Sequence, residues 1–225
     1  MTGGKNKPMS VKPIYKTVLS ESHTTLIEKK SKFIAHVRPA DNERAAIDFI
    51  NEIRAQYPDA THNVYAYVID ENNIFRYSDD GEPSGTAGMP VLDAIRKPGI
   101  VDAAVVVTRY FGGTLLGTGG LVHTYGAAAS QGLAAAGIIT RTLCDVLSVK
   151  TDYTLSGKLS HMIASGGIIL EDTVYAENVE FILCSPIDET ERLVGELCDV
   201  TNGRAETAVT GRKYVNKADE QPDRL

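Results

Sequence analysis

The stretch DAAVVVTRYF, residues 102–111, constrains the fold more than any other part of the chain. It is a continuous apolar run of strand length, without the alternation of a strand that has one face in water. Such a strand is expected in the middle of a sheet that is covered on both faces. The segment LVHTYGAAASQGLAAAG, residues 121–137, then predicts an Ala-rich helix, whose alanines allow close approach to a sheet.

The segments before this run predict the rest of an N-terminal α+β domain. Residues 15–39 predict two strands that meet at or near IEKKSKF. Residues 41–58 predict an amphipathic helix that Asp41 can cap. A hairpin around the turn ENN follows, and then a short helix that stops at Pro98-Gly99. The apolar face of the amphipathic helix is formed by Ala46, Phe49, Ile50 and Ile53.

From about residue 142 the pattern changes to β-α-β-β-α-β, which is the split-βαβ or ferredoxin-like arrangement. The second helix of this part is expected to start with a capping box of Ser185 and Asp188, with Pro186 at its first position. The sequence therefore predicts an α+β protein of two domains. The expected divisions are a disordered tail at 1–14, an N-terminal domain at 15–140, a ferredoxin-like domain at 141–214 and a disordered tail at 215–225.

The net charge of -6 is unevenly spread along the chain. Residues 1–140 carry 14 basic and 14 acidic side chains, so the whole acidic surplus lies in residues 141–225. An acidic C-terminal part will not hold a phosphate backbone by bulk charge, because that affinity comes from Lys and Arg displacing counterions. If nucleic acid is a partner, the expected surface is a local patch in the N-terminal part.

The three cysteines, Cys144, Cys184 and Cys198, are scattered and form no C-x-x-C pair. This pattern favours free thiols in a reducing compartment, and all three are expected to be small apolar core residues. No apolar run approaches the ~20 residues that a membrane span needs, and the first residues lack the apolar core of a secretory signal. We therefore expect a cytoplasmic protein with no membrane partner, cofactor or metal.

Three glycine-rich segments crowd the N-terminal domain: SDDGEPSGTAG, TRYFGG and LGTGGL. Gly119 and Gly120, before a long helix, would let a phosphate or carboxylate approach the backbone, and Arg109 could contact the same anion. The alternative is that the glycines serve turns and close helix–sheet packing. The spacing matches neither a Walker loop nor a dinucleotide fingerprint.

The polar side chains of these segments allow several interpretations. Asp79, Asp80 and Glu82 could position a turn, pair with Arg109 or a lysine, or act in catalysis or metal binding. Adjacent carboxylates on an extended backbone diverge, so Asp79 and Asp80 are not expected to share one ion. His62 could join the site or serve as a structural hydrogen-bonding residue.

Two further features concern charge near the same segments. Lys29, Lys30 and Lys32 form the one basic cluster and are the best candidates for meeting phosphate, although a solvated face is the alternative. His123 falls in the first turn of the expected long helix, where the helix dipole favours a neutral imidazole.

Four motifs occur in order along the chain: SKF, H..YAY, SDDGEP.GTAG.P and TRYFGG..LG.GGL. On these motifs the chain resembles the IMPACT/YigZ family from about residue 15 to 140, and its C-terminal part resembles the second domain of the bacterial members. The resemblance implies an N-terminal fold like the second domain of small-subunit ribosomal protein five. It also implies a ferredoxin-like domain similar to the last domain of elongation factor G.

The resemblance also implies which residues matter. Where relatives commonly continue the last motif with R-A-Y, this chain has HTY, so His123 replaces an arginine. If that arginine helps to hold an anion in the relatives, this chain would bind it more weakly, or only when His123 is protonated. The family motif falls on Lys32, His62, Asp79, Asp80, Glu82, Arg109, Tyr110, Phe111, Gly112, Gly113 and Gly117.

Two functions follow from these observations. The first is a translation-associated regulatory or binding module that contacts the ribosome, RNA or a partner protein, as the resemblance to translational regulators implies. The alternative is a hydrolase or phosphate-handling enzyme with the carboxylates, His62 and Arg109 around a cleft, which requires these side chains to converge. The expected binding residues are Lys32, His62, Asp79, Asp80, Glu82, Arg109, Tyr110, Gly112, Gly113, Gly119 and Gly120.

Overall fold

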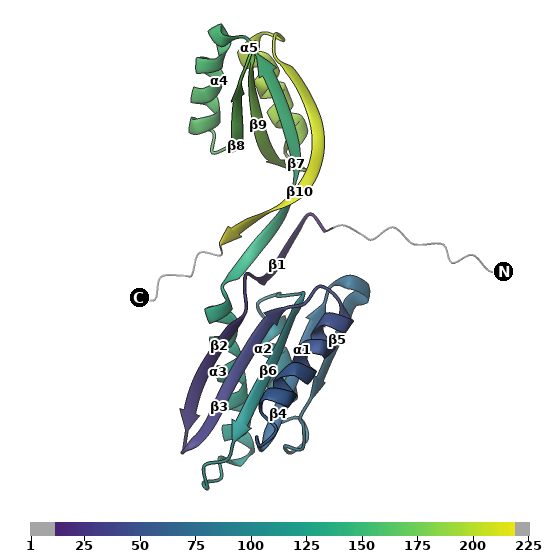
Figure 1. Cartoon of the computed structure of the whole chain (residues 1–225), viewed down its shortest axis with the longest axis vertical. Coiled ribbons are helices and arrows are strands. Elements are labelled where there is room, and N and C mark those ends of the chain that lie inside the picture. The colour runs from purple at the N-terminus through teal and green to yellow at the C-terminus, as the bar shows by residue number, and fades with distance from the viewer. Residues whose placement is uncertain (1–11, 219–225) are drawn as a thin grey trace, which may run out of the picture. The chain divides into compact units, whose positions relative to one another are not determined.

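The computed structural model describes residues 12–218 (Figure 1). They form two compact α+β units, one of residues 15–140 and one of residues 141–217 together with residues 12–14. This architecture is the α+β, two-domain class that the sequence predicts. The tails expected at 1–14 and 215–225 lie mostly outside the described residues, but the last strand of the structure extends to Ala218.

The N-terminal unit contains an antiparallel five-stranded sheet in the order β2-β3-β6-β4-β5. The central strand β6 comes from the apolar run, and Val105, Val106 and Val107 are fully buried in it, which confirms the prediction. A short 3-10 turn, η1 (Glu71–Asn73), joins the last two strands. The strands are β2 (Ser22–Glu28), β3 (Ser31–Pro39), β4 (His62–Ile69), β5 (Ile74–Ser78) and β6 (Ala103–Tyr110).

Helices cover both faces of this sheet (Figure 1). The helix α1 (Glu43–Gln56) packs on Ala104 and Val106 of β6, whereas α2 (Gly88–Arg96) and α3 (Gly117–Ala136) pack on Val105 and Val107. Because side chains alternate along a strand, the two helix layers lie on opposite faces. The four residues predicted for the buried face of α1 are the four that the structure buries.

Three local predictions in this unit are wrong. Residues 15–39 contribute three strands and not two, because β1 (Ile14–Val18) precedes the β2–β3 hairpin. Asn42, and not Asp41, caps α1, since its side chain accepts a hydrogen bond from the backbone of Ala45 at 2.9 Å. The helix α3 begins at Gly117, so His123 lies beyond its first turn.

The C-terminal unit contains a sheet in which β10 pairs with β7 and the order continues β7-β9-β8. The order β10-β7-β9-β8 is that of a ferredoxin-like fold, as predicted. Its core packs Leu147, Phe181 and Leu183 of the sheet against Leu159 and Leu197 of the helices. The elements are β7 (Ile138–Thr151), α4 (Tyr153–Ser165), β8 (Ile169–Tyr175), β9 (Val179–Pro186), α5 (Thr190–Thr201) and β10 (Glu206–Ala218).

Two predictions for this unit are wrong. Ser185 and Pro186 end strand β9, where Ser185 pairs with Asp145 of β7, so they do not start a helix. The helix α5 begins at Thr190 without a side-chain cap. Cys144 and Cys184 are buried, and burial raises the pKa of Cys184 to about 11, but Cys198 is exposed and not a core residue.

A buried histidine is expected to make the stability of the N-terminal unit depend on pH. His36 of β3 is fully buried, and its Nδ1 lies 2.9 Å from Nδ1 of His23. Burial, and then the neighbouring His23, lower the pKa of His36 to about 4. Between pH about 6.5 and about 4, His36 is therefore protonated in the unfolded chain but neutral in the folded chain.

Above pH about 6.5, His36 is neutral in both the folded and the unfolded chain and costs no stability. As the pH falls to about 4, we expect the free energy of unfolding to fall by up to about 3 kcal/mol. Urea unfolding over this range measures the effect. His36→Gln should flatten the pH dependence, whereas His161→Gln, at an exposed position of α4, should leave it unchanged. Equal pH dependence in the wild-type protein and His36→Gln would contradict the assignment.

Candidate functional site

Residues far apart in the sequence meet at one end of the N-terminal sheet. Strand β4 begins at His62, β6 ends at Tyr110, and the antiparallel register places His62 and Phe33 opposite Arg109 on its two sides. The loop after β6 leads into α3 at this same end (Figure 1). The motifs H..YAY and TRYFGG are therefore neighbours.

Arg109 is part of a buried ion pair. Its Nη1 donates to Oε1 of Glu82 at 2.5 Å, and the two side chains are only 6% and 4% exposed. The hydroxyl of Tyr125 donates to the same oxygen at 2.8 Å, and burial together with Glu82 raises the pKa of Tyr125. The Arg109 guanidinium also lies over the rings of Phe33 and Phe111, at 5.4 and 5.6 Å. The expected pairing of Glu82 with Arg109 is present.

His62 has a defined tautomer in this arrangement. Its Nδ1 lies 2.7 Å from the backbone oxygen of Asp80. A carbonyl oxygen only accepts hydrogen bonds, so Nδ1 carries the proton. The other ring nitrogen, Nε2, lies 3.8 Å from Oε1 of Glu82. His62 therefore directs a hydrogen-bond acceptor toward the Glu82–Arg109 pair.

The three carboxylates of SDDGEP point in different directions. Asp79 accepts hydrogen bonds at the start of α2, from the backbone of Gly85, Ala87 and Gly88 at 2.8, 3.1 and 2.8 Å. It positions the loop, because it satisfies N–H groups at a helix start. The hydrolase interpretation requires these carboxylates to converge, and this geometry does not support it.

Asp80 makes a separate set of contacts. It accepts from Nη2 of Arg54 at 2.8 Å and from the backbone N–H of Asn63 at 2.7 Å. The pairing of Asp80 with Arg54 of α1, and not with Arg109, was missed in the sequence because α1 has no motif that marks it. Tyr125 was missed for a similar reason, since its place on the buried face of α3 indicates core packing and not a hydroxyl partner.

A cavity of about 430 Å³ opens beside the ion pair. Leu115 is 82% exposed and Phe111 is 46% exposed, so apolar side chains stand at the surface here. Polar groups of the ion pair and of His62 share the cavity with these apolar walls. The lining residues are Thr61, His62, Glu82, Pro83, Arg109, Phe111, Leu115, Leu116, Gly117, Thr118 and Leu121.

The glycines of this region have different structural roles. A Cβ on Gly112 would lie 2.1 Å from the backbone carbon of Lys30, so Gly112 permits close packing of the TRYFGG loop on the β2–β3 turn. Gly113 adopts a φ of 79°, which favours glycine. Gly119 and Gly120 lie inside the first turn of α3, where a Cβ on Gly119 would meet no atom within 4 Å.

The basic cluster lies at the tip of the β2–β3 hairpin. Lys29 and Lys30 form its turn with φ of 43° and 67°, and both are exposed. Lys32 is also exposed and lies opposite Tyr110 in the register, so strand alternation places it on the other face from Arg109. The Tyr110 hydroxyl donates to Asp59 at 2.9 Å.

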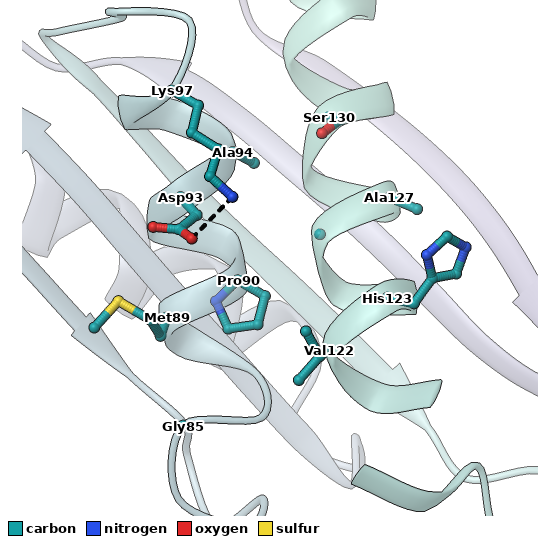
Figure 2. A pocket seen from close by; sticks show the side chains of 11 residues that line it. Gly85, Met89, Pro90, Asp93, Ala94, Lys97, Val122, His123, Ala127 and Ser130 are labelled. Atoms are coloured by element: carbon teal, nitrogen blue, oxygen red, sulfur yellow. Dashed lines mark ion pairs between the residues drawn. The ribbon is translucent and has the colours of Figure 1, made fainter. Parts of the chain in front are cut away.

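His123 does not belong to the Arg109 cavity. It lines a separate groove of about 420 Å³ between α2 and α3, together with Met89, Pro90 and Val122 (Figure 2). An ion pair between Asp93 and Lys97, with 3.1 Å between the charged atoms, borders this groove on α2. A change at His123 therefore affects a surface other than the Arg109 site.

Within residues 12–218, no three or more His, Cys, Asp or Glu side chains are grouped to hold a metal ion. No helix in the same range is long and apolar enough to cross a membrane.

Comparison with known proteins identifies this combination of units. Residues 29–133 match the family model of the Impact N-terminal domain, and residues 149–204 match a domain of unknown function, DUF1949. The fold and the motifs thus define a two-domain protein of the Impact N-terminal type. The chain belongs to the IMPACT family.

Individual relatives agree with this assignment. IMPACT family member YvyE of Bacillus subtilis is 39% identical over 205 residues, which cover 91% of this chain and 94% of that protein. IMPACT family member YigZ of Escherichia coli is 45% identical over 114 residues, which cover 48% of this chain and 56% of that protein. A crystal structure of a hypothetical protein is similar with a TM-score of 0.56 and 28% identity, covering 89% of this chain and 99% of that one.

Proposed function

We propose that this protein is a translation-associated binding module of the cytoplasm that contacts ribosomal RNA through the end of its N-terminal sheet. The proposed contact surface consists of the lysine tip, which is Lys29, Lys30 and Lys32, together with Phe111. Aromatic side chains offer a stacking surface for bases, and lysines neutralise phosphates.

The observation that carries this proposal is that the charges of the lysine tip are not neutralised. Within residues 12–218, none of the three lysines forms an ion pair, and the nearest carboxylate in the hairpin register is that of Glu28, next to the turn. Most other arginines and lysines in the unit are held by carboxylates. These pairs are Arg38 with Glu21 and Glu52, Arg44 with Asp48, Arg54 with Asp80, Lys97 with Asp93 and Arg109 with Glu82.

The tip and the aromatic side chain are held together. The backbone N–H of Gly112 donates to the hydroxyl of Ser31 at 3.1 Å, which attaches the TRYFGG loop to the hairpin. Phe111 precedes Gly112, and its own N–H donates to Thr61 at 3.1 Å. This arrangement favours RNA over a partner protein as the main contact. The lysines can displace counterions from phosphates, and the ring of Phe111 beside them can stack on a base.

Sedimentation with ribosomes tests the proposal. If three lysines meet phosphates, the slope of log affinity against log salt is about −2, so raising the salt fourfold should weaken binding about 20-fold. Failure to sediment with ribosomes at low salt would contradict the proposal. If the affinity for ribosomes does not change with salt and the protein does not bind purified ribosomal RNA, its contact is with a protein instead.

A further inference from the structure

We propose that the cavity beside Arg109 receives one unstacked guanine base of the bound RNA. This inference rests on the proposed function. It adds a preference for one base to a surface that would otherwise contact phosphates and stack on any base. Sequence-specific recognition of RNA commonly uses bases that are splayed out of the strand, stacked on aromatic rings and hydrogen-bonded at their edges.

The cavity has the size and walls of such a site. Its volume of about 430 Å³ lies in the range of small-ligand pockets, about 300–1,000 Å³. Leu116, Leu121 and Pro83 provide apolar walls. Phe111, which is half-exposed and also lines the cavity, offers its ring to a base or to the neighbouring nucleotide.

The polar groups inside have hydrogen-bonding capacity that the fold leaves unused. Oε1 of Glu82 takes both hydrogen bonds from Arg109 and Tyr125, while Oε2 accepts none from any residue that the structure describes. Nε of Arg109 is buried and has no hydrogen-bond partner among residues 12–218. His62 directs Nε2 toward the same place, because its Nδ1 is held by Asp80.

Guanine fits this set better than the other bases. Its Watson–Crick edge carries two adjacent N–H donors, and the free Oε2 of Glu82 has two lone pairs with which to accept them. Its O6 lies next to these donors on the same edge and is an acceptor that suits the guanidinium of Arg109 beside Glu82. Adenine and cytosine carry a single amino group there, and uracil carries a single ring N–H.

The surroundings also fit a nucleotide rather than a free apolar ligand. Gly112 brings the backbone of Lys30 against the loop that carries Phe111, so the turn of Lys29 and Lys30 lies next to the loop that lines the cavity. The phosphates that flank an extruded base would therefore have Lys29 and Lys30 close by. The ion pair of Arg109 and Glu82 has no net charge, so the base site itself need not attract phosphate.

Binding of short oligouridylates that differ only in one central nucleotide tests this inference. Fluorescence anisotropy with the full chain should show about tenfold tighter binding when the central nucleotide is guanosine than when it is adenosine, cytidine or uridine. Equal and salt-dependent affinity for all four oligonucleotides would overturn the guanine site and leave the proposed function standing. No binding to any of them would overturn both.

A pair of matched variants tests the location. Thr118 lines the cavity and is exposed, so Thr118→Phe should fill the cavity without disturbing the core. It should abolish the preference for guanosine and keep the affinity for plain oligouridylate. Thr114→Phe, at an exposed position of the loop that leads into α3 and outside the cavity lining, should keep the preference. Retention of the full preference in Thr118→Phe would overturn the assignment to this cavity.

Discussion

Replacing Glu82 with leucine is expected to lower the free energy of unfolding by about 3–5 kcal/mol, because Arg109 then stays buried without its opposite charge. The two side chains are only 4% and 6% exposed, so solvent screens the unpaired charge of Arg109 far less than it would at the surface. The hydroxyl of Tyr125 also loses its acceptor. Urea unfolding of Glu82→Leu beside the wild-type protein measures the loss.

The double variant Glu82→Leu/Arg109→Leu separates lost charge pairing from lost packing. Replacement of both partners by apolar residues removes the unpaired charge, so the double variant should be more stable than Glu82→Leu alone. Asp93→Ala is the control, since it breaks the exposed pair with Lys97, and such pairs contribute about 0–1 kcal/mol. If Glu82→Leu lowers the free energy of unfolding as little as Asp93→Ala does, the Glu82–Arg109 pair does not stabilise the fold as a buried pair should.

The second large effect is expected for Gly112→Ala. The added Cβ would lie 2.1–2.3 Å from the backbone of Lys30 and Ser31, and backbone atoms cannot move aside as a flexible side chain can. The β2–β3 turn and the TRYFGG loop must therefore separate, and the cost should be about 3 kcal/mol or more. The variant should also bind RNA more weakly, because Phe111 would no longer be held beside the lysine tip.

Gly119→Ala is the matched control for this prediction. Gly119 lies in the first turn of α3, where a Cβ meets no atom within 4 Å. Because alanine favours a helix over glycine, the substitution should be neutral or stabilise the protein by up to about 1 kcal/mol. Unfolding curves that place Gly112→Ala and Gly119→Ala at the same stability would show that the close approach at Gly112 does not matter.

Much of the fold is readable in the sequence because it depends on burial patterns. The run at 102–111 specifies the covered central strand β6, and the apolar spacing at Ala46, Phe49, Ile50 and Ile53 specifies the buried face of α1. The start of α5 is different, because Ser185 carries a local capping signal but pairs with Asp145 in the sheet. Tertiary pairing of the strand overrides the local signal there.

The candidate site is less readable because its contacts are not local. Asp79 and Asp80 are adjacent in the sequence, yet one holds the start of α2 and the other holds Arg54 of α1. Glu82 meets Tyr125 over a separation of 43 residues. Spacing along the chain identifies the loop as special, and only the three-dimensional arrangement shows that its carboxylates have separate partners.

The lysine tip is the most direct point at which to test the proposed RNA surface. The measurement is the salt dependence of RNA binding in Lys29→Gln/Lys30→Gln/Lys32→Gln and in the control Arg44→Gln/Arg76→Gln/Lys97→Gln, which removes three exposed charges elsewhere in the same unit. Each phosphate contact that is lost should reduce the slope of log affinity against log salt by about 0.7.

We predict that the slope of about −2 falls to near zero in the lysine-tip variant and stays unchanged in the control. An unchanged slope in the lysine-tip variant, or an equal loss in the control, would contradict the proposed surface.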